Sequence, residues 1–120
     1  AVVFTAYGVA CWYDPAIAAT AAGLSILRGD GYAELGGMYG GFQTGVGVFC
    51  GLATRRRHWR AGALAMLALG LGALWLARLS SAFTTTQPLS AYTWGALAFE
   101  LFLAGLATRA LLSEQADRQR

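Results

Sequence analysis

The most informative pattern in the sequence is a series of long apolar runs separated by short polar segments. Three of these runs, at 35–54, 61–81 and 91–112, are near the roughly 20 residues that a helix needs to cross a bilayer. The first run, 1–13, gives only about 20 Å of helix, so we interpret it as a span whose opening turns are missing here. The pattern predicts an all-α fold, an integral membrane four-helix bundle that forms one domain over 1–120.

The segments between the runs contain residues that break or end helices, such as proline, glycine, threonine and charged residues. In chain order the predicted connections are a break at Asp14-Pro15, a short surface helix at 16–27, a turn at 28–31, a loop at 55–60, a loop at 83–89 and a polar tail at 113–120.

The composition agrees with this pattern, because hydrophobic residues make up 57% of the 120 residues and charged residues only 12%. The charged fraction is about half of that in an ordinary soluble domain. This composition excludes a disordered chain, a collagen and a disulfide scaffold. Cys11 and Cys50 are expected near opposite faces of the bilayer, too far apart to pair, and are interpreted as small buried hydrophobic side chains.

The distribution of arginine predicts the orientation in the membrane. All nine cations are arginine, and four of them lie in 55–60, whereas 28–34 carries one arginine and two acidic residues. The positive-inside rule therefore places the Arg55–Arg60 loop and the C-terminus in the cytoplasm, and we expect a bacterial inner membrane. The cations are too few and too scattered for a nucleic-acid partner, so membrane lipids are the expected partners.

Glycine is concentrated in the second apolar run. Gly37, Gly41 and Gly45 form two overlapping small-xxx-small motifs, and Gly36–Gly40 and Gly47–Gly51 add more. Such motifs let another helix approach closely. One interpretation is helix packing inside the bundle. The other is a docking face for another subunit.

Two charged residues interrupt the later apolar runs. Glu100 lies near the middle of the fourth run and Arg78 near the outer end of the third. A carboxylate at the bilayer centre is costly unless it is paired or protonated. Because side chains on a helix lean towards its N-terminus, these two lean towards each other and are predicted to pair. Glu34, Tyr39 and Gln43 are the expected hydrogen-bonding neighbours in this intramembrane polar network.

Three interpretations of this pair remain open on the sequence alone. The pair can be a structural staple that fixes the register of two helices. It can be a site for proton relay or for a polar ligand. Glu100 can also face a partner chain.

The sequence contains no motif of a known catalytic or cofactor site. It has no P-loop, no dinucleotide fingerprint, no nucleophile elbow, and no haem or metal motif. We therefore expect no catalytic residue, no cofactor and no metal, and we interpret His58 as a solvated residue at the membrane boundary.

Several short motifs occur in an order that resembles a family of small, uncharacterised bacterial integral membrane proteins with four predicted helices. The matching positions are Asp14-Pro15, the stretch 34–41 with its Tyr-Gly-Gly step, Ala77-Arg78-Leu79 and Glu100. The family often has an arginine two residues after its first glutamate, where this chain has Gly36. The resemblance implies the four-helix membrane fold and carries no activity.

The first hypothesis for function is a non-enzymatic accessory subunit that packs against a larger membrane complex, which could be respiratory, photosynthetic or a transport complex. The alternative is a small oligomeric carrier or channel that uses an intramembrane Arg78–Glu100 pair. A third hypothesis is a membrane enzyme or lipid-binding protein that uses the same pair.

Overall fold

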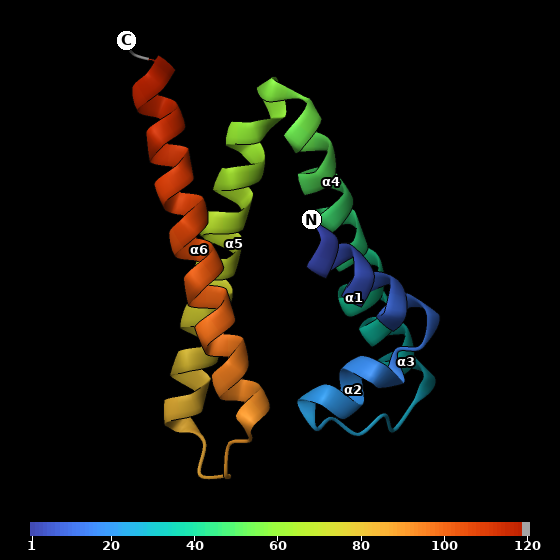
Figure 1. The fold of residues 1–120 in the computed structure, drawn as a ribbon. Coiled ribbons are helices and arrows are strands. Elements are labelled where there is room, and N and C mark those ends of the chain that lie inside the picture. The colour runs from blue at the N-terminus through green and yellow to red at the C-terminus, as the bar shows by residue number, and fades with distance from the viewer. Residues whose placement is uncertain (119–120) are drawn as a thin grey trace. The chain divides into compact units, whose positions relative to one another are not determined.

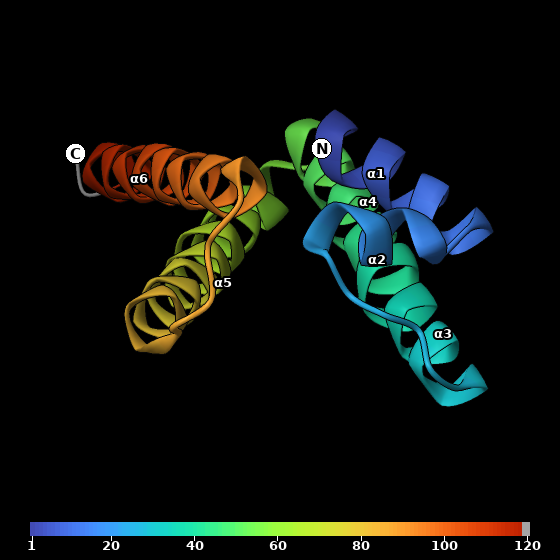
Figure 2. The ribbon, with the colours of Figure 1, turned by 90° about the horizontal axis from the view of Figure 1, so that it is seen from below.

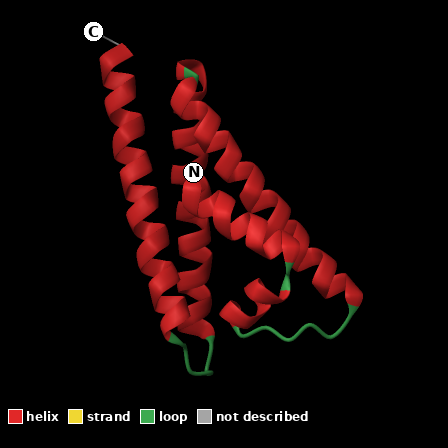
Figure 3. Ribbon diagram, turned by 45° about the vertical axis from the view of Figure 1, so that its right-hand side comes forward, coloured by secondary structure: helices red, strands yellow, loops and turns green. Residues whose placement is uncertain are grey.

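The structure is a computed structural model that describes residues 1–118, and all its regular elements are helical (Figures 1 and 3). The chain forms two compact units, Ala1–Arg57 and His58–Arg120, and each is described by itself. In chain order the elements are α1 (Val2–Tyr13), α2 (Ala16–Ala22), α3 (Gly29–Leu35), the π-helical segment η1 (Gly36–Phe42), α4 (Gln43–Arg55), α5 (Arg57–Thr84) and α6 (Ala91–Arg118).

The core of the first unit is a close antiparallel contact between α1 and the helix formed by η1 and α4 (Figure 2). A Cβ atom on Gly40 would lie 2.7 Å from Cα of Trp12, and one on Gly8 would lie 2.5 Å from the backbone nitrogen of Thr44. Small residues therefore let the two backbones approach more closely than ordinary side chains allow.

A sharp elbow separates α1 from α2, which is turned by 112° from it. Asp14 ends α1 with an extended backbone, and its Oδ1 accepts a hydrogen bond of 3.0 Å from the backbone nitrogen of Ala16. Gly23 ends α2 with a φ of 69°, a left-handed conformation that glycine adopts without steric cost. The predicted short helix is thus present but ends at Ala22.

The predicted second span has a different structure from the one that its apolar run suggests. The backbone is helical without interruption from Gly29 to Arg55, and the middle part, Gly36–Phe42, is π-helical. The predicted turn at 28–31 is wrong, because Gly29 to Gly31 form the first turn of α3. Asp30 in that turn interacts favourably with the positive end of the helix dipole.

The second unit is a hairpin of the two longest helices, α5 and α6 (Figure 1). Both are rich in alanine and leucine, which favour helices. The buried residues of α6 alternate in spacing between three and four, and they are Leu97, Glu100, Ala104 and Ala107. This spacing defines one packed face of the helix.

Two segments that the sequence analysis predicted as non-helical are mostly helical in the structure. The Arg55–Arg60 segment is not a loop, since only Arg56 has an extended backbone between α4 and α5. The predicted polar tail continues α6 as far as Arg118, and its residues 119–120 lie outside the described part of the chain. Residues such as Arg, Glu and Gln have high helix propensity, so loss of hydrophobicity alone does not end a helix.

Two helices of the described residues, α5 and α6, are long and apolar enough to cross a membrane. A third passage meets the same criteria only if α1 and α2 are counted as one bent pair. The second predicted span does not meet them, because η1 divides it and leaves α4 with 13 residues. The structure thus supports an all-α protein with two candidate membrane spans, and the four-helix membrane bundle remains a prediction.

Candidate functional site

Arg78 on α5 and Glu100 on α6 form an ion pair within the second unit. Nε of Arg78 donates hydrogen bonds of 3.0 and 3.1 Å to Oε1 and Oε2 of Glu100. Nη2 of Arg78 donates another of 2.8 Å to Oε1. The side-on guanidinium thus engages both carboxylate oxygens, a bidentate geometry that strengthens the pair.

The side chains of the two partners differ in their exposed fraction. The Glu100 side chain is 6% exposed and that of Arg78 is 25% exposed. Glu100 occupies one position of the packed face of α6, between Leu97 and Ala104. The carboxylate therefore needs the guanidinium for compensation, because an isolated buried charge would be very costly.

The other three residues of the predicted polar network lie in the first unit. Glu34 is exposed on α3, Tyr39 is half-buried in η1, and Gln43 is half-buried at the start of α4. The sequence analysis thus predicts two sets of polar residues that the fold places in different units. A network that joins all five stays a prediction.

The predicted glycine motif does not form the contact with α1. A Cβ on Gly37 or Gly45 would meet nothing within 4 Å, and one on Gly41 would approach only the Gly36 carbonyl oxygen, at 4.0 Å. Met38 and Phe42 beside this stripe are 52% and 63% exposed. The three glycines therefore form an open stripe on the first unit, which we call the Gly37–Gly41–Gly45 stripe.

A second set of small residues makes the close contact with α1. The sequence analysis named its glycines as packing motifs but did not separate this face from the Gly37–Gly41–Gly45 stripe. Along η1 and α4 the residues that meet α1 are spaced by four, three and four positions, and they are Gly40, Thr44, Gly47 and Gly51. The residues that they meet have the same spacing. These are Ala1, just before α1, and Thr5, Gly8 and Trp12 in α1. This matched spacing is typical of two helices that pack along a coiled-coil seam. It is the sequence pattern from which the contact between α1 and α4 could have been predicted.

The seam contains one polar atom with an unusual environment. Oγ1 of Thr44 is buried and has no hydrogen-bond partner among the described residues. A Cβ on Gly8 would lie only 2.5 Å from this oxygen. The absence of a side chain at Gly8 thus makes room for the Thr44 hydroxyl.

The described residues contain no cluster of three or more His, Cys, Asp or Glu side chains that could hold a metal ion. Cys11 and Cys50 are both free thiols, 0% and 8% exposed. Cys11 precedes Trp12, which meets Gly40 at one end of the seam, and Cys50 precedes Gly51, which meets Ala1 at the other end. This separation fits two packed thiols better than a redox pair.

The fold and the buried pair define a class, an all-α protein with two membrane-capable helices joined by an intramolecular Arg–Glu bridge. The chain belongs to the family described as a domain of unknown function, DUF4345, whose model matches residues 1–111. No curated protein and no solved structure matches the chain. The family agrees with the predicted resemblance in having no assigned function.

Proposed function

We propose that the chain is a non-enzymatic integral membrane protein that acts as an accessory subunit of a larger membrane complex. The observation that carries this proposal is the open Gly37–Gly41–Gly45 stripe, which has no close neighbour in its own unit. Stripes of this kind gain dispersion contacts when another transmembrane helix packs on them, whereas lipid fills them poorly.

The geometry of the ion pair supports a structural role in this subunit. Both oxygens of Glu100 accept hydrogen bonds from Arg78, so the two charges compensate each other within one hairpin. A pair that is satisfied in this way fixes the register of α5 against α6. We therefore interpret it as a staple that keeps the hairpin rigid for docking.

The proposed location is the bacterial inner membrane, with four passages of the chain across it. The Arg55–Arg60 segment and the C-terminus face the cytoplasm, and the segment Arg28–Glu34 faces the other side. The support is the excess of arginine in the first of these segments and the acidic residues in the last.

The test is purification from native membranes in a mild detergent, followed by identification of the proteins that migrate with the chain. Gly41→Leu places a large side chain on the stripe and should remove the partner while the thermal stability of the chain itself stays unchanged. Gly70→Leu is the matched control, since Gly70 is an open glycine on α5, outside the stripe. It should retain the partner.

Two results would contradict the proposal. If the wild-type chain purifies without any stoichiometric partner, it is not a subunit. If Gly41→Leu unfolds the chain, the stripe packs against the chain's own helices and is not a docking face.

A carrier or channel is the second candidate, and one observation favours it. Glu100 is a buried ionisable group on a membrane-capable helix, a feature that often marks an ion or proton path. Proton flux into vesicles with the purified chain, lost in Glu100→Gln while the fold is retained, would support the carrier and replace the subunit proposal.

A further inference from the structure

The elbow between α1 and α2 determines how the segment after Pro15 can lie in a membrane. α2 is turned by 112° from α1, so its seven residues add no length along the direction of α1. They instead run across that direction and slightly back. α1 and α2 therefore do not form one longer span.

The position of the elbow along the α4 helix gives its depth. A Cβ on Gly36 would lie 3.2 Å from Cγ of Pro15, so the elbow is level with Gly36. From Gly36 to Arg55 the continuous helix advances by at most about 28 Å, the length at the α-helical rise of about 1.5 Å per residue. This length matches the hydrocarbon core of about 30 Å. If Arg55 marks one boundary of the hydrocarbon core, Pro15 lies at the opposite boundary.

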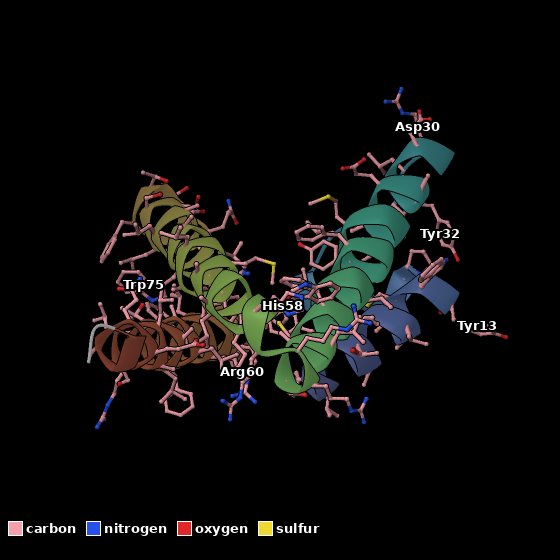
Figure 4. All side chains as sticks on the ribbon, turned by 90° about the horizontal axis from the view of Figure 1, so that it is seen from above. Tyr13, Asp30, Tyr32, His58, Arg60 and Trp75 are labelled. Atoms are coloured by element: carbon pink, nitrogen blue, oxygen red, sulfur yellow. The ribbon has the colours of Figure 1, made fainter. Side chains whose placement is uncertain are left out.

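The side chains around the elbow have the character of a membrane boundary. Trp12 and Tyr13 end α1 and are 63% and 92% exposed, and Tyr13 projects away from the ribbon (Figure 4). Tryptophan and tyrosine favour the level of the lipid head groups, where the ring meets acyl chains and the polar atom meets water. Polar residues follow at Arg28 and Asp30, beyond the apolar part of the segment.

The segment from Ala16 to Leu27 has one face packed on protein and another open. Ala18 and Ala19 are buried in the unit, whereas Ile17, Leu24 and Leu27 are 41%, 52% and 88% exposed. α2 lies across the span direction at the boundary, and the open aliphatic side chains in and just after it fit an interfacial position.

We propose that residues 16–27 lie in the lipid–water interface as a membrane-surface hook, with Ile17 and Leu24 in contact with the upper acyl chains and Leu27 at the level of the head groups. The partner is the phospholipid surface itself. The hook rests on the membrane assignment of the chain and is independent of the accessory-subunit proposal.

The test uses tryptophan fluorescence in vesicles whose phospholipids carry bromine either near the head group or near the chain ends. The four native tryptophans are replaced by phenylalanine, and a single tryptophan is placed at Leu27→Trp. Its fluorescence should be lost more strongly with bromine near the head group. Phe102→Trp is the control for membrane insertion, because Phe102 is 63% exposed halfway along α6, and deep bromine should quench it more.

The outcomes separate the hook from the membrane assignment. Quenching of Phe102→Trp without quenching of Leu27→Trp would leave α6 in the membrane and overturn the hook. Stronger quenching of Leu27→Trp by the deep bromine would also overturn it, since the segment would then enter the core. Absence of quenching at both positions would overturn the membrane assignment.

A second measurement avoids the loss of four tryptophans. A nitroxide on Leu27→Cys, in a chain with Cys11→Ala and Cys50→Ala, should show access to oxygen and to a water-soluble nickel chelate that is typical of the head-group level. Full exposure to the chelate would place residue 27 in water and overturn the hook.

Discussion

The Arg78–Glu100 pair is a residue-level consequence of the direction in which helical side chains lean. The two helices run in opposite directions, so a residue near the end of α5 and one about ten positions into α6 lean towards a common level. The ion pair was therefore predictable from spacing and charge. Its Nε-centred geometry was not, because a rotamer depends on the neighbouring side chains.

Removal of one partner of this pair should be more harmful than removal of both. Arg78→Gln leaves a buried carboxylate, and Glu100→Gln leaves an uncompensated cation, each at about 3–5 kcal/mol of folding free energy. The double variant Arg78→Gln with Glu100→Gln should be more stable than at least one single variant. Unfolding of the purified protein in mixed micelles measures the coupling, and additive losses would contradict it.

A conservative variant tests the geometry of the same pair. Arg78→Lys keeps the charge but cannot engage both oxygens through a planar group. It should lie between wild type and Arg78→Gln in stability. A stability equal to that of wild type would mean that charge alone matters and that the hydrogen-bond geometry does not.

The seam glycines are expected to tolerate no side chain, in contrast to the open stripe. A Cβ on Gly40 would meet the Trp12 backbone at 2.7 and 2.8 Å, so one of the two helices must shift. We expect Gly40→Ala to cost about 1–3 kcal/mol of stability, as is typical of overpacking. Gly45→Ala is the matched control and should be neutral or slightly stabilising, because alanine favours helices. Equal effects at both sites would argue against the seam.

At the level of elements, helix existence was predictable and helix boundaries were not. The apolar runs locate α1, α5 and α6 because a membrane-like composition and high helix propensity coincide there. The number of apolar residues in 36–42 does not distinguish a π-helix from an α-helix, so the π-helical segment Gly36–Phe42 was not predicted. π-helical turns are rare and often lie at functional sites, so this segment is the main feature that the sequence analysis missed.

The elbow between α1 and α2 is supported by one side-chain hydrogen bond, so its contribution to stability can be tested by substitution. Asp14 accepts from the Ala16 backbone, which satisfies a donor at the start of α2. Asp14→Ala should lower stability by about 1 kcal/mol, whereas Asp14→Asn keeps the acceptor and should lose less. Thermal unfolding of the three proteins compares them. Equal losses for alanine and asparagine would show that the negative charge, and not the hydrogen bond, supports the elbow.

At the level of the whole molecule, the division into two units explains which part of the candidate site could be predicted from the sequence. The ion pair joins two helices that are adjacent in the chain, so helix geometry alone brings its partners together. Glu34, Tyr39 and Gln43 belong to the other unit. Their relation to the pair depends on tertiary packing between distant segments, for which a single sequence carries no direct signal.

The orientation of the whole chain follows from charges at the ends of its helices, and site-directed labelling tests it. In the proposed topology Asp30 lies outside and Arg57 lies in the cytoplasm, and both are exposed in the structure. A membrane-impermeant maleimide added to intact spheroplasts should label Asp30→Cys and leave Arg57→Cys unmodified until the membrane is opened. The wild-type chain is the control, because Cys11 and Cys50 are buried and should stay unlabelled. The reverse pattern, with Arg57→Cys labelled from outside and Asp30→Cys protected, would overturn the orientation. It would place the arginine-rich segment outside, against the positive-inside rule.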